Sequence, residues 1–270
     1  MKMKMKRISY LIISLCLVSL QSFASCSEDK DQPSFRASGG VSGTENGHNY
    51  VDLGLPSGTM WATTNVGASN PQDYGNCYAW GEISTKDKKK YSWENYTYGS
   101  DCNSLTKYCN NSVNGNVDNK TILEDADDVA VKSWGGKWRM PTAAQQEELM
   151  SQCYWVWTDD YNGSSKSGYI VYKAKSASDS GVKVGKGNTA SYSYSLSDNH
   201  IFLPSAGFIF AVKENSDPNL NEGLGGYYWS ASLSLETPYD AWSIDFNSVE
   251  VYGHVNSRSF GQPVRPVFKP

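Results

Sequence analysis

Trp134-Gly-Gly-Lys-Trp138-Arg-Met-Pro141-Thr142-Ala-Ala-Gln145-Gln-Glu-Glu-Leu149 is the stretch that decides the fold. Its two glycines allow a tight bend, and Pro141 disfavours a helical conformation at the residue before it. Thr142 stands where a helix N-cap belongs, and Gln145 follows three residues later as its capping-box partner. Ala143 to about Gln152 contains good helix formers and neither Gly nor Pro. The stretch therefore predicts a short extended segment, a bend and a capped helix.

A helix of this length is only marginally stable by itself, so it needs an apolar surface to pack on. Strand-like stretches later in the chain supply one, because aromatic and β-branched residues alternate there with polar ones. We expect Trp138, Leu149 and Trp229 in the core of this packing. A second helix is predicted from Asp125 to Ser133, with acids in its first turn and Gly135 beyond its end. Few helices and many short antiparallel strands predict the α+β class.

Four motifs occur in the same order as in a known family. They are Tyr50-Val-Asp-Leu-Gly-Leu-Pro-Ser-Gly-Thr-Met-Trp61-Ala, Tyr78-Ala-Trp-Gly-Glu82, the stretch quoted above, and Tyr228-Trp-Ser-Ala-Ser232 with Pro263-Val-Arg-Pro-Val267. In these motifs the chain resembles the Fibrobacter succinogenes major paralogous domain (Fib_succ_major) over about residues 47–268. The resemblance implies a C-type-lectin-like fold, related to that of formylglycine-generating enzymes, in an outer-membrane lipoprotein of the Bacteroidota. It implies very little about activity.

Residues 1–25 have the pattern of a signal peptide. Basic residues precede an apolar run from Ile8 to Leu20, which is too short for a comfortable membrane span. Ala24-Ser25-Cys26 follows the run and resembles a lipobox, so Cys26 is expected to become the lipidated first residue. The protein would then be anchored in the outer membrane by lipid and exposed at the cell surface. Simple cleavage near Ser25, giving a soluble periplasmic protein, is the alternative.

Residues 26–45 are predicted to be a flexible tether, because charged, Gly- and Ser-rich sequence forms no core. Its start, Ser27-Glu28-Asp29-Lys30-Asp31, also resembles the surface-export signal of Bacteroidota lipoproteins. Residues 46–270 are predicted to be one C-type-lectin-like domain, since no linker or fixed-period repeat divides them. Removing the leader, which carries four basic residues and no acids, moves the formal net charge from −4 to −8. Such an acidic chain argues against a nucleic-acid partner.

Residues with catalytic or metal-binding chemistry are scattered. His48, His200 and His254 stand alone, and neither Cys-x-x-Cys nor a pair of histidines indicates zinc. No serine stands in a nucleophile-elbow motif. We therefore expect no catalytic residue, no metal and no cofactor.

Four cysteines follow the predicted tether: Cys77, Cys102, Cys109 and Cys153. Cys102 and Cys109 either close a small disulfide loop in an oxidising compartment or, like the other two, remain thiols. The formylglycine-generating relatives bind copper through cysteines late in the domain. This chain has no cysteine after Cys153, so the resemblance does not carry that activity across.

The segment from Tyr239 to Ser257 alternates between apolar and polar residues, which predicts strands with one buried and one exposed face. The side chains predicted to face the core are Trp242, Ile244, Phe246, Val249, Val251 and Val255. Ser243 is predicted to face outward. The residues predicted to bind a ligand, on the outward face or its rim, are Asp245, Asn247, Glu250, Tyr252, His254, Asn256 and Arg258. Such a composition is common on recognition surfaces, but an ordinary solvated sheet face has the same pattern.

This region also resembles the variable segment of C-type-lectin-like proteins that are diversified by retroelements, through Tyr228-Trp-Ser-x-Ser232, Ala241-Trp-x-x-x-Phe246 and Val264-Arg-Pro-Val267. In those proteins, exposed strand positions vary while apolar positions stay. We therefore expect a surface-anchored lipoprotein that binds a glycan or protein ligand and performs no catalysis. The alternatives are a structural or adhesin-assembly component of the cell envelope and, third, an enzyme related to formylglycine-generating enzymes.

Overall fold

The computed structural model of the protein describes residues 40–270, except residues 191, 213–216 and 219. The predicted signal peptide, the predicted lipidation site Cys26 and most of the predicted tether lie outside the described residues. The described residues cluster into one compact unit. They contain two α-helices and eleven short strands in three sheets, nearly all paired antiparallel, which confirms the predicted α+β class.

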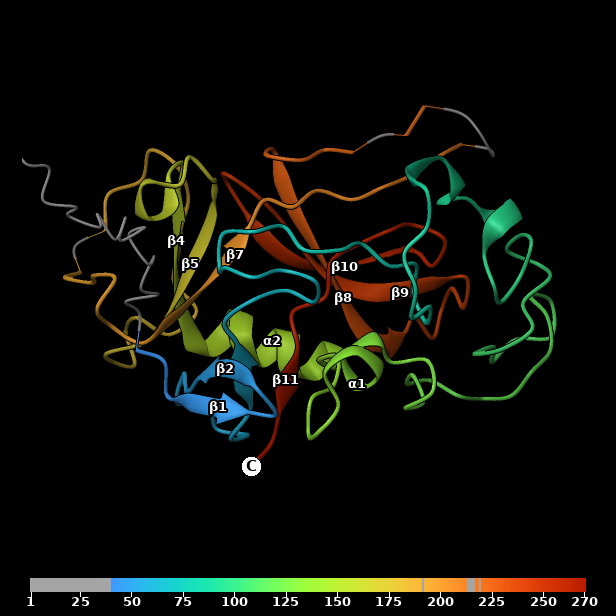
Figure 1. The fold of residues 1–270 in the computed structure, drawn as a ribbon, viewed down its shortest axis with the longest axis horizontal. Helices are drawn as coiled ribbons and strands as arrows, with labels where there is room; N and C mark the ends of the chain where they lie inside the picture. Colours follow the sequence, from blue (N-terminus) through green and yellow to red (C-terminus); the bar gives the residue numbers. More distant parts are fainter. Residues whose placement is uncertain (1–39, 191, 213–216, 219) are drawn as a thin grey trace, which may run out of the picture. The chain divides into compact units, whose positions relative to one another are not determined.

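The first sheet joins the two ends of the described chain, and Figure 1 shows β1 and the C-terminus at the same edge. Its order is β1 (Gly43–Glu45), β2 (His48–Val51), β3 (Met60–Ala62) and β11 (Val267–Phe268). The predicted tether extended to residue 45, but residues 43–45 pair with β2 as a strand. The reason is the two-residue turn Asn46-Gly47, in which both residues have positive φ, as a tight hairpin requires.

The other two sheets carry the longer strands. The second sheet has the order β6 (Lys183–Val184), β4 (Cys153–Thr158), β5 (Gly168–Lys173) and β7 (His200–Pro204). The third sheet has the order β10 (Val251–Ser257), β9 (Asp240–Asn247) and β8 (Gly225–Leu233). The register of β8 on β9 shifts between Trp229 and Leu233, where a bulge interrupts the ladder.

Helix α2 (Ala143–Gln152) forms as the sequence predicted. The Thr142 side chain accepts a hydrogen bond from the Gln145 N–H, and the Gln145 side chain accepts one from the Thr142 N–H. This capping box satisfies two N–H groups that would otherwise lack partners. Gln146 lies buried on the sheet side of the helix, where its amide donates to the Tyr228 carbonyl at 2.9 Å. The helix is therefore fixed to β8 by a buried hydrogen bond as well as by apolar packing.

Helix α1 (Val129–Trp134) is shorter than predicted. It begins after Asp128, whose carboxylate accepts hydrogen bonds from the N–H groups of Ala130 and Val131 and from that of Met140. Asp128 is therefore the N-cap, which keeps the preceding acids outside the helix. Gly135 ends the helix with a φ of 64°. Three short 3-10 helices cover Lys88–Lys90, Trp93–Asn95 and Tyr161–Gly163.

Large aromatic side chains fill the core between α2 and the sheets. One cluster places Trp155 of β4 and Phe246 of β9 with Leu149 of α2. A second cluster holds Trp138 and Trp229. Trp138, Leu149 and Trp229 are each 0 % exposed, which confirms their prediction as core residues. Burial of such large apolar surfaces is the main source of stability in a fold with little helix.

Arg265, from the C-terminal motif, is fully buried without a carboxylate partner among the described residues. Its guanidinium donates to the Asn65 side chain at 2.8 Å and to the carbonyls of Ala62 and Phe202 at 3.2 and 2.8 Å. Burial lowers the pKa of Arg265 to about 10, which is still high enough to keep it charged at neutral pH. Arg265 thus joins the end of β3 to β7.

Candidate functional site

The outward face of the β9–β10 hairpin brings polar residues from three strands together. Asp245 of β9 stands directly opposite Tyr252 of β10 on one side and Tyr227 of β8 on the other. His254 stands opposite Ser243 in the same ladder. Residues directly opposite each other in a sheet project from the same face, so these five side chains share one surface.

Asp245 lies at the bottom of this surface. It is 3 % exposed, and its carboxylate accepts hydrogen bonds from the Ser243 hydroxyl at 2.7 Å and from the Asn256 amide at 3.0 and 3.1 Å. The Nδ1 atom of His254 lies 3.4 Å from Oδ2 of Asp245. Burial raises the pKa of Asp245, while the hydrogen bonds from Ser243 and Asn256 and the charge of His254 oppose the rise. The prediction that Asp245 contacts ligand directly is therefore wrong: its carboxylate is covered and holds its neighbours in place.

Asn256, His254 and Tyr252 form the accessible layer above Asp245. The Asn256 amide nitrogen is bound to Asp245 and Ser243, which leaves its carbonyl oxygen to accept a hydrogen bond from outside. The His254 side chain is 53 % exposed, and its ring meets that of Tyr252 edge-on at 5.9 Å. Tyr252 is 40 % exposed. These three predicted site residues thus do lie together. Tyr252 presents a phenol ring to solvent, His254 an imidazole and Asn256 a carbonyl oxygen that can accept a hydrogen bond.

An aromatic wall borders this layer on the β8 side. Phe208 packs edge-on against Tyr227 at 4.7 Å and stacks with Phe260 at 5.7 Å. The Asn221 amide donates to the Tyr227 hydroxyl at 2.8 Å. The sequence did not predict this wall, because Phe208 and Asn221 belong to the long segment between β7 and β8, which has no alternation typical of a strand. Tyr227 was detectable, since it precedes the Tyr228-Trp-Ser motif on the opposite face of the strand.

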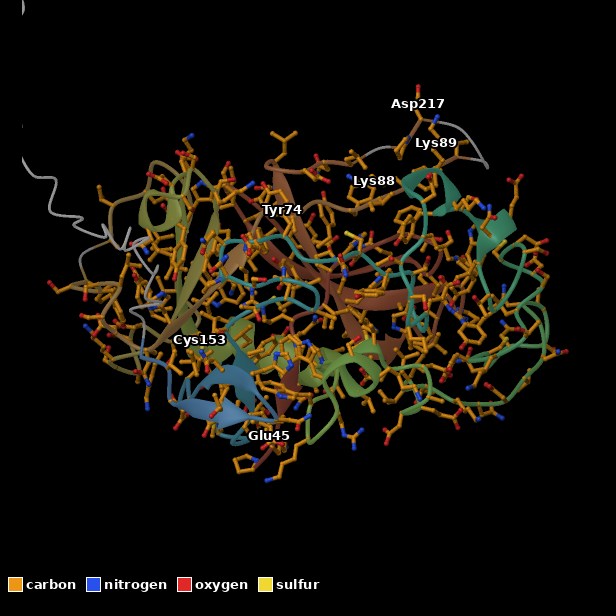
Figure 2. All side chains as sticks on the ribbon, viewed as in Figure 1. Glu45, Tyr74, Lys88, Lys89, Cys153 and Asp217 are labelled. Atoms are coloured by element: carbon orange, nitrogen blue, oxygen red, sulfur yellow. The ribbon has the colours of Figure 1, made fainter. Side chains whose placement is uncertain are left out.

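Ion pairs connect the segment that carries Phe208 to the 3-10 helix Lys88–Lys90. Lys88 Nζ lies 3.0 Å from Glu222 Oε1, and Lys89 Nζ lies 3.6 Å from Asp217 Oδ1. Figure 2 shows Lys88, Lys89 and Asp217 side by side at one edge of the molecule. Exposed ion pairs contribute little energy, so these two pairs stabilise the position of the segment only weakly.

Arg258 does not belong to the surface, and its prediction as a ligand contact is wrong. It is 0 % exposed, and its guanidinium centre lies 4.9 Å from the Trp80 ring. The groups that accept its hydrogen bonds, at 2.9 to 3.1 Å, are the Tyr96 hydroxyl and the carbonyls of Tyr108, Pro238 and Lys107. Segments from far earlier in the chain cover this end of the hairpin, so Arg258 is a structural residue.

Asn247 and Glu250 lie in the turn and shape it. The Asn247 side-chain oxygen accepts hydrogen bonds from the N–H groups of Val249 and Glu250 at 2.8 and 3.2 Å. Its amide donates to the Glu250 carboxylate at 3.3 Å. These two predicted site residues are thus occupied with each other at the end of the hairpin, and no hydrogen bond within the described chain connects them to the Asp245 cluster.

The inward face is only partly buried, which corrects the predicted core. Ile244, Phe246 and Val251 are buried as expected, whereas Trp242 is 38 % and Val249 74 % exposed and Val255 is half-buried. Helix α2 covers only part of this face, and Val249 lies in the turn, outside the strands. Ser243, predicted to face outward, does so but is covered, at 1 % exposure.

A cleft of about 560 Å³ lies elsewhere, between α2, the segment before it and β11. Three of its charged groups are already engaged with one another or with backbone: the Asp128 carboxylate caps α1, and Arg139 pairs with Asp125 at 2.5 Å, while Lys137 and Lys269 also line the cleft. Among the described residues, no group of three His, Cys, Asp or Glu side chains is arranged to hold a metal ion. This cleft therefore offers a weaker case for a site than the hairpin face does.

Cys77, Cys102, Cys109 and Cys153 are all free thiols in the structure, so the disulfide alternative for Cys102 and Cys109 is not realised. Burial is the main cause that raises the pKa of the Cys77 thiol to about 12 and that of Cys153 further, which leaves both unreactive at neutral pH. Within residues 40–270, leaving aside the few not described, no helix is both long and apolar enough for a membrane span.

No protein-family model matches the chain, and the searches of curated proteins and of solved structures found no match. The candidate site consequently depends on the geometry of this chain.

Proposed function

We propose that the protein is a surface lipoprotein whose C-type-lectin-like domain, of the Fibrobacter succinogenes major paralogous type, binds a ligand on the outward face of the β9–β10 hairpin. The observation that carries this proposal is the buried carboxylate of Asp245, which orients Asn256 and His254 beside the 40 % exposed Tyr252. Polar groups held in fixed positions beside aromatic rings are the usual composition of a small-ligand site.

The chemistry of the surface favours a glycan as the ligand. A sugar ring offers hydroxyl groups that donate to an acceptor such as the Asn256 carbonyl, and an apolar ring face that packs on an aromatic side chain such as Tyr252. Tyr227 of β8 and Tyr252 of β10 lie on either side of Asp245, with the single strand β9 between them. We infer no bond-breaking step at this surface, because the Ser243 hydroxyl, which donates to the Asp245 carboxylate, is only 1 % exposed and is therefore out of reach of a ligand.

A glycan array, followed by calorimetry on each sugar that binds, tests the proposal. The comparison sets the wild type against Tyr252→Ala and Asn256→Ala, with and without calcium, and uses Val113→Ala on a remote exposed loop as the matched control. Both site variants should weaken binding at least tenfold while the control binds normally. If both bind as the wild type does, the hairpin face is not the site.

A further inference from the structure

Strand β10 forms an outer edge of its sheet and pairs only with β9. The Asn247 N–H donates to the Glu250 carbonyl and the Arg258 N–H to the Tyr239 carbonyl, each at 3.1 Å. Hydrogen-bonded pairs alternate along an antiparallel ladder, so the even-numbered residues of β10 bond to β9. The N–H and C=O groups of residues 251, 253 and 255 therefore point away from β9. Within the described chain, no hydrogen bond reaches these outward groups.

This edge lacks the features that normally prevent strands from pairing with one another. Residues 251–257 contain no Lys, Arg or Pro, and their ladder with β9 runs without a bulge. The other edges are protected. Strands β1 and β6 are three and two residues long, and β7 ends in Pro204. Beyond β8, Gly207 pairs with Gly226. β10 is thus the long, unguarded edge among the described strands.

The sequence of this edge is symmetric in chemical type about Gly253. It reads Val251-Tyr252-Gly253-His254-Val255: a valine, a ring, a glycine, a ring and a valine. In an antiparallel pair of two such strands centred on Gly253, Val251 stands opposite Val255 of the other strand. Tyr252 then stands opposite His254 on the other face. Both pairs are types that stabilise sheets, and no like charges meet.

We propose that β10 pairs antiparallel with β10 of a second copy of this chain, with the two Gly253 residues facing each other. The pairing satisfies the outward main-chain groups of residues 251, 253 and 255 and joins two three-stranded sheets into one. It is two-fold symmetric, as most dimer contacts are. A second copy suits this edge better than an unrelated peptide, because only a strand with the same symmetric order matches it at every position. The proposal stands whether or not the hairpin face binds a glycan.

The side of the sheet that faces α2 leaves room for the added strand. A cleft of about 240 Å³, lined by Met150, Trp242 and Gly253 among others, lies at this place. A Cβ atom added at Gly253 would lie 3.6 Å from Met150 Cε and 3.9 Å from Trp242 Cζ3, which are ordinary contact distances. The helix therefore does not close over the strand. The partial exposure of Trp242 is also explained, since a second copy beside Gly253 would shield it.

Sedimentation velocity of the full chain over a concentration series tests the proposal with a charge-matched pair of variants. A Cβ at position 253 fits within one copy, but Gly253→Lys places two like charges face to face across the proposed contact, so it should leave a monomer with the circular-dichroism spectrum of the folded wild type. Val113→Lys adds the same charge on a remote loop that is 73 % exposed and should dimerise as the wild type does. The proposal would be overturned if the wild type stays monomeric at every concentration, or if the Gly253→Lys variant still dimerises.

A cysteine pair tests the register. In the proposed dimer, Gly253 of one copy and Gly253 of the other form a hydrogen-bonded pair. The two Cα atoms of such a pair are about 5.5 Å apart, a separation that a disulfide can span. Gly253→Cys should therefore form a dimer that reductant separates, with a peptide cross-linked through position 253. Val255→Cys, which would face Val251, should form none. The proposal fails if position 253 does not cross-link, or if a monomer instead binds an unrelated extended peptide at this edge.

Discussion

Arg258→Ala should destabilise the protein by about 4 kcal/mol. The guanidinium satisfies two buried carbonyls, one partly buried carbonyl and one buried hydroxyl, and its removal leaves these four acceptors without it. Each buried group left unpaired costs about 1–3 kcal/mol. Water that enters the vacated space can bond to some of these acceptors and lowers the total cost. We therefore use the lower end of the range, about 1 kcal/mol for each of the four acceptors. Loss of the contact with the Trp80 ring acts in the same direction.

Urea unfolding followed by tryptophan fluorescence measures this effect, since Trp80 lies beside the mutated position. Arg139→Ala is the matched control, because the Arg139 side chain is 52 % exposed and forms an ion pair with the exposed Asp125. The control should change the unfolding free energy by less than about 1 kcal/mol. If Arg258→Ala lowers the unfolding free energy no more than the control does, then Arg258 is not buried and residues 96–108 do not cover this end of the hairpin.

Three further predictions concern the core, the buried carboxylate and the leader. Trp138→Ala should cost about 3–5 kcal/mol, because it removes a fully buried ring and its 2.8 Å hydrogen bond to the Glu45 carbonyl; wild-type melting would contradict this packing. Burial raises the pKa of Asp245, so the folded state favours the protonated carboxyl. Protonation of Asp245 therefore adds to the unfolding free energy below the pKa of the unfolded state, about 3.9. This contribution is lost as the pH rises through the pKa of the folded state. The unfolding free energy of the wild type relative to Asp245→Asn should therefore fall as the pH rises above about 4, and parallel pH profiles would refute the raised pKa. Cys26→Ala should leave an unprocessed precursor that takes up no labelled palmitate, whereas normal labelling would exclude Cys26 as the lipidation site.

Local signals in the sequence were enough for the elements that depend on near neighbours. Thr142 and Gln145 cap each other across three residues, so the start of α2 follows from composition alone. The alternation after Tyr239 likewise predicts a hairpin with two distinct faces, and the structure has one. Asn46-Gly47 is an equally local signal, because this dipeptide is typical of a tight hairpin turn and indicates that β1 belongs to the domain rather than to the tether.

The sequence by itself determined which side chains share a face, because strand geometry repeats every two residues. Only the tertiary structure decided what covers each face. Arg258 is buried because Tyr108, 150 residues earlier, returns to accept its hydrogen bond, and Trp242 is 38 % exposed because an open cleft separates it from α2. Asp245 is covered although its alternation marks it as outward. Burial depends on contacts between segments remote in sequence, and no periodicity within one strand records them.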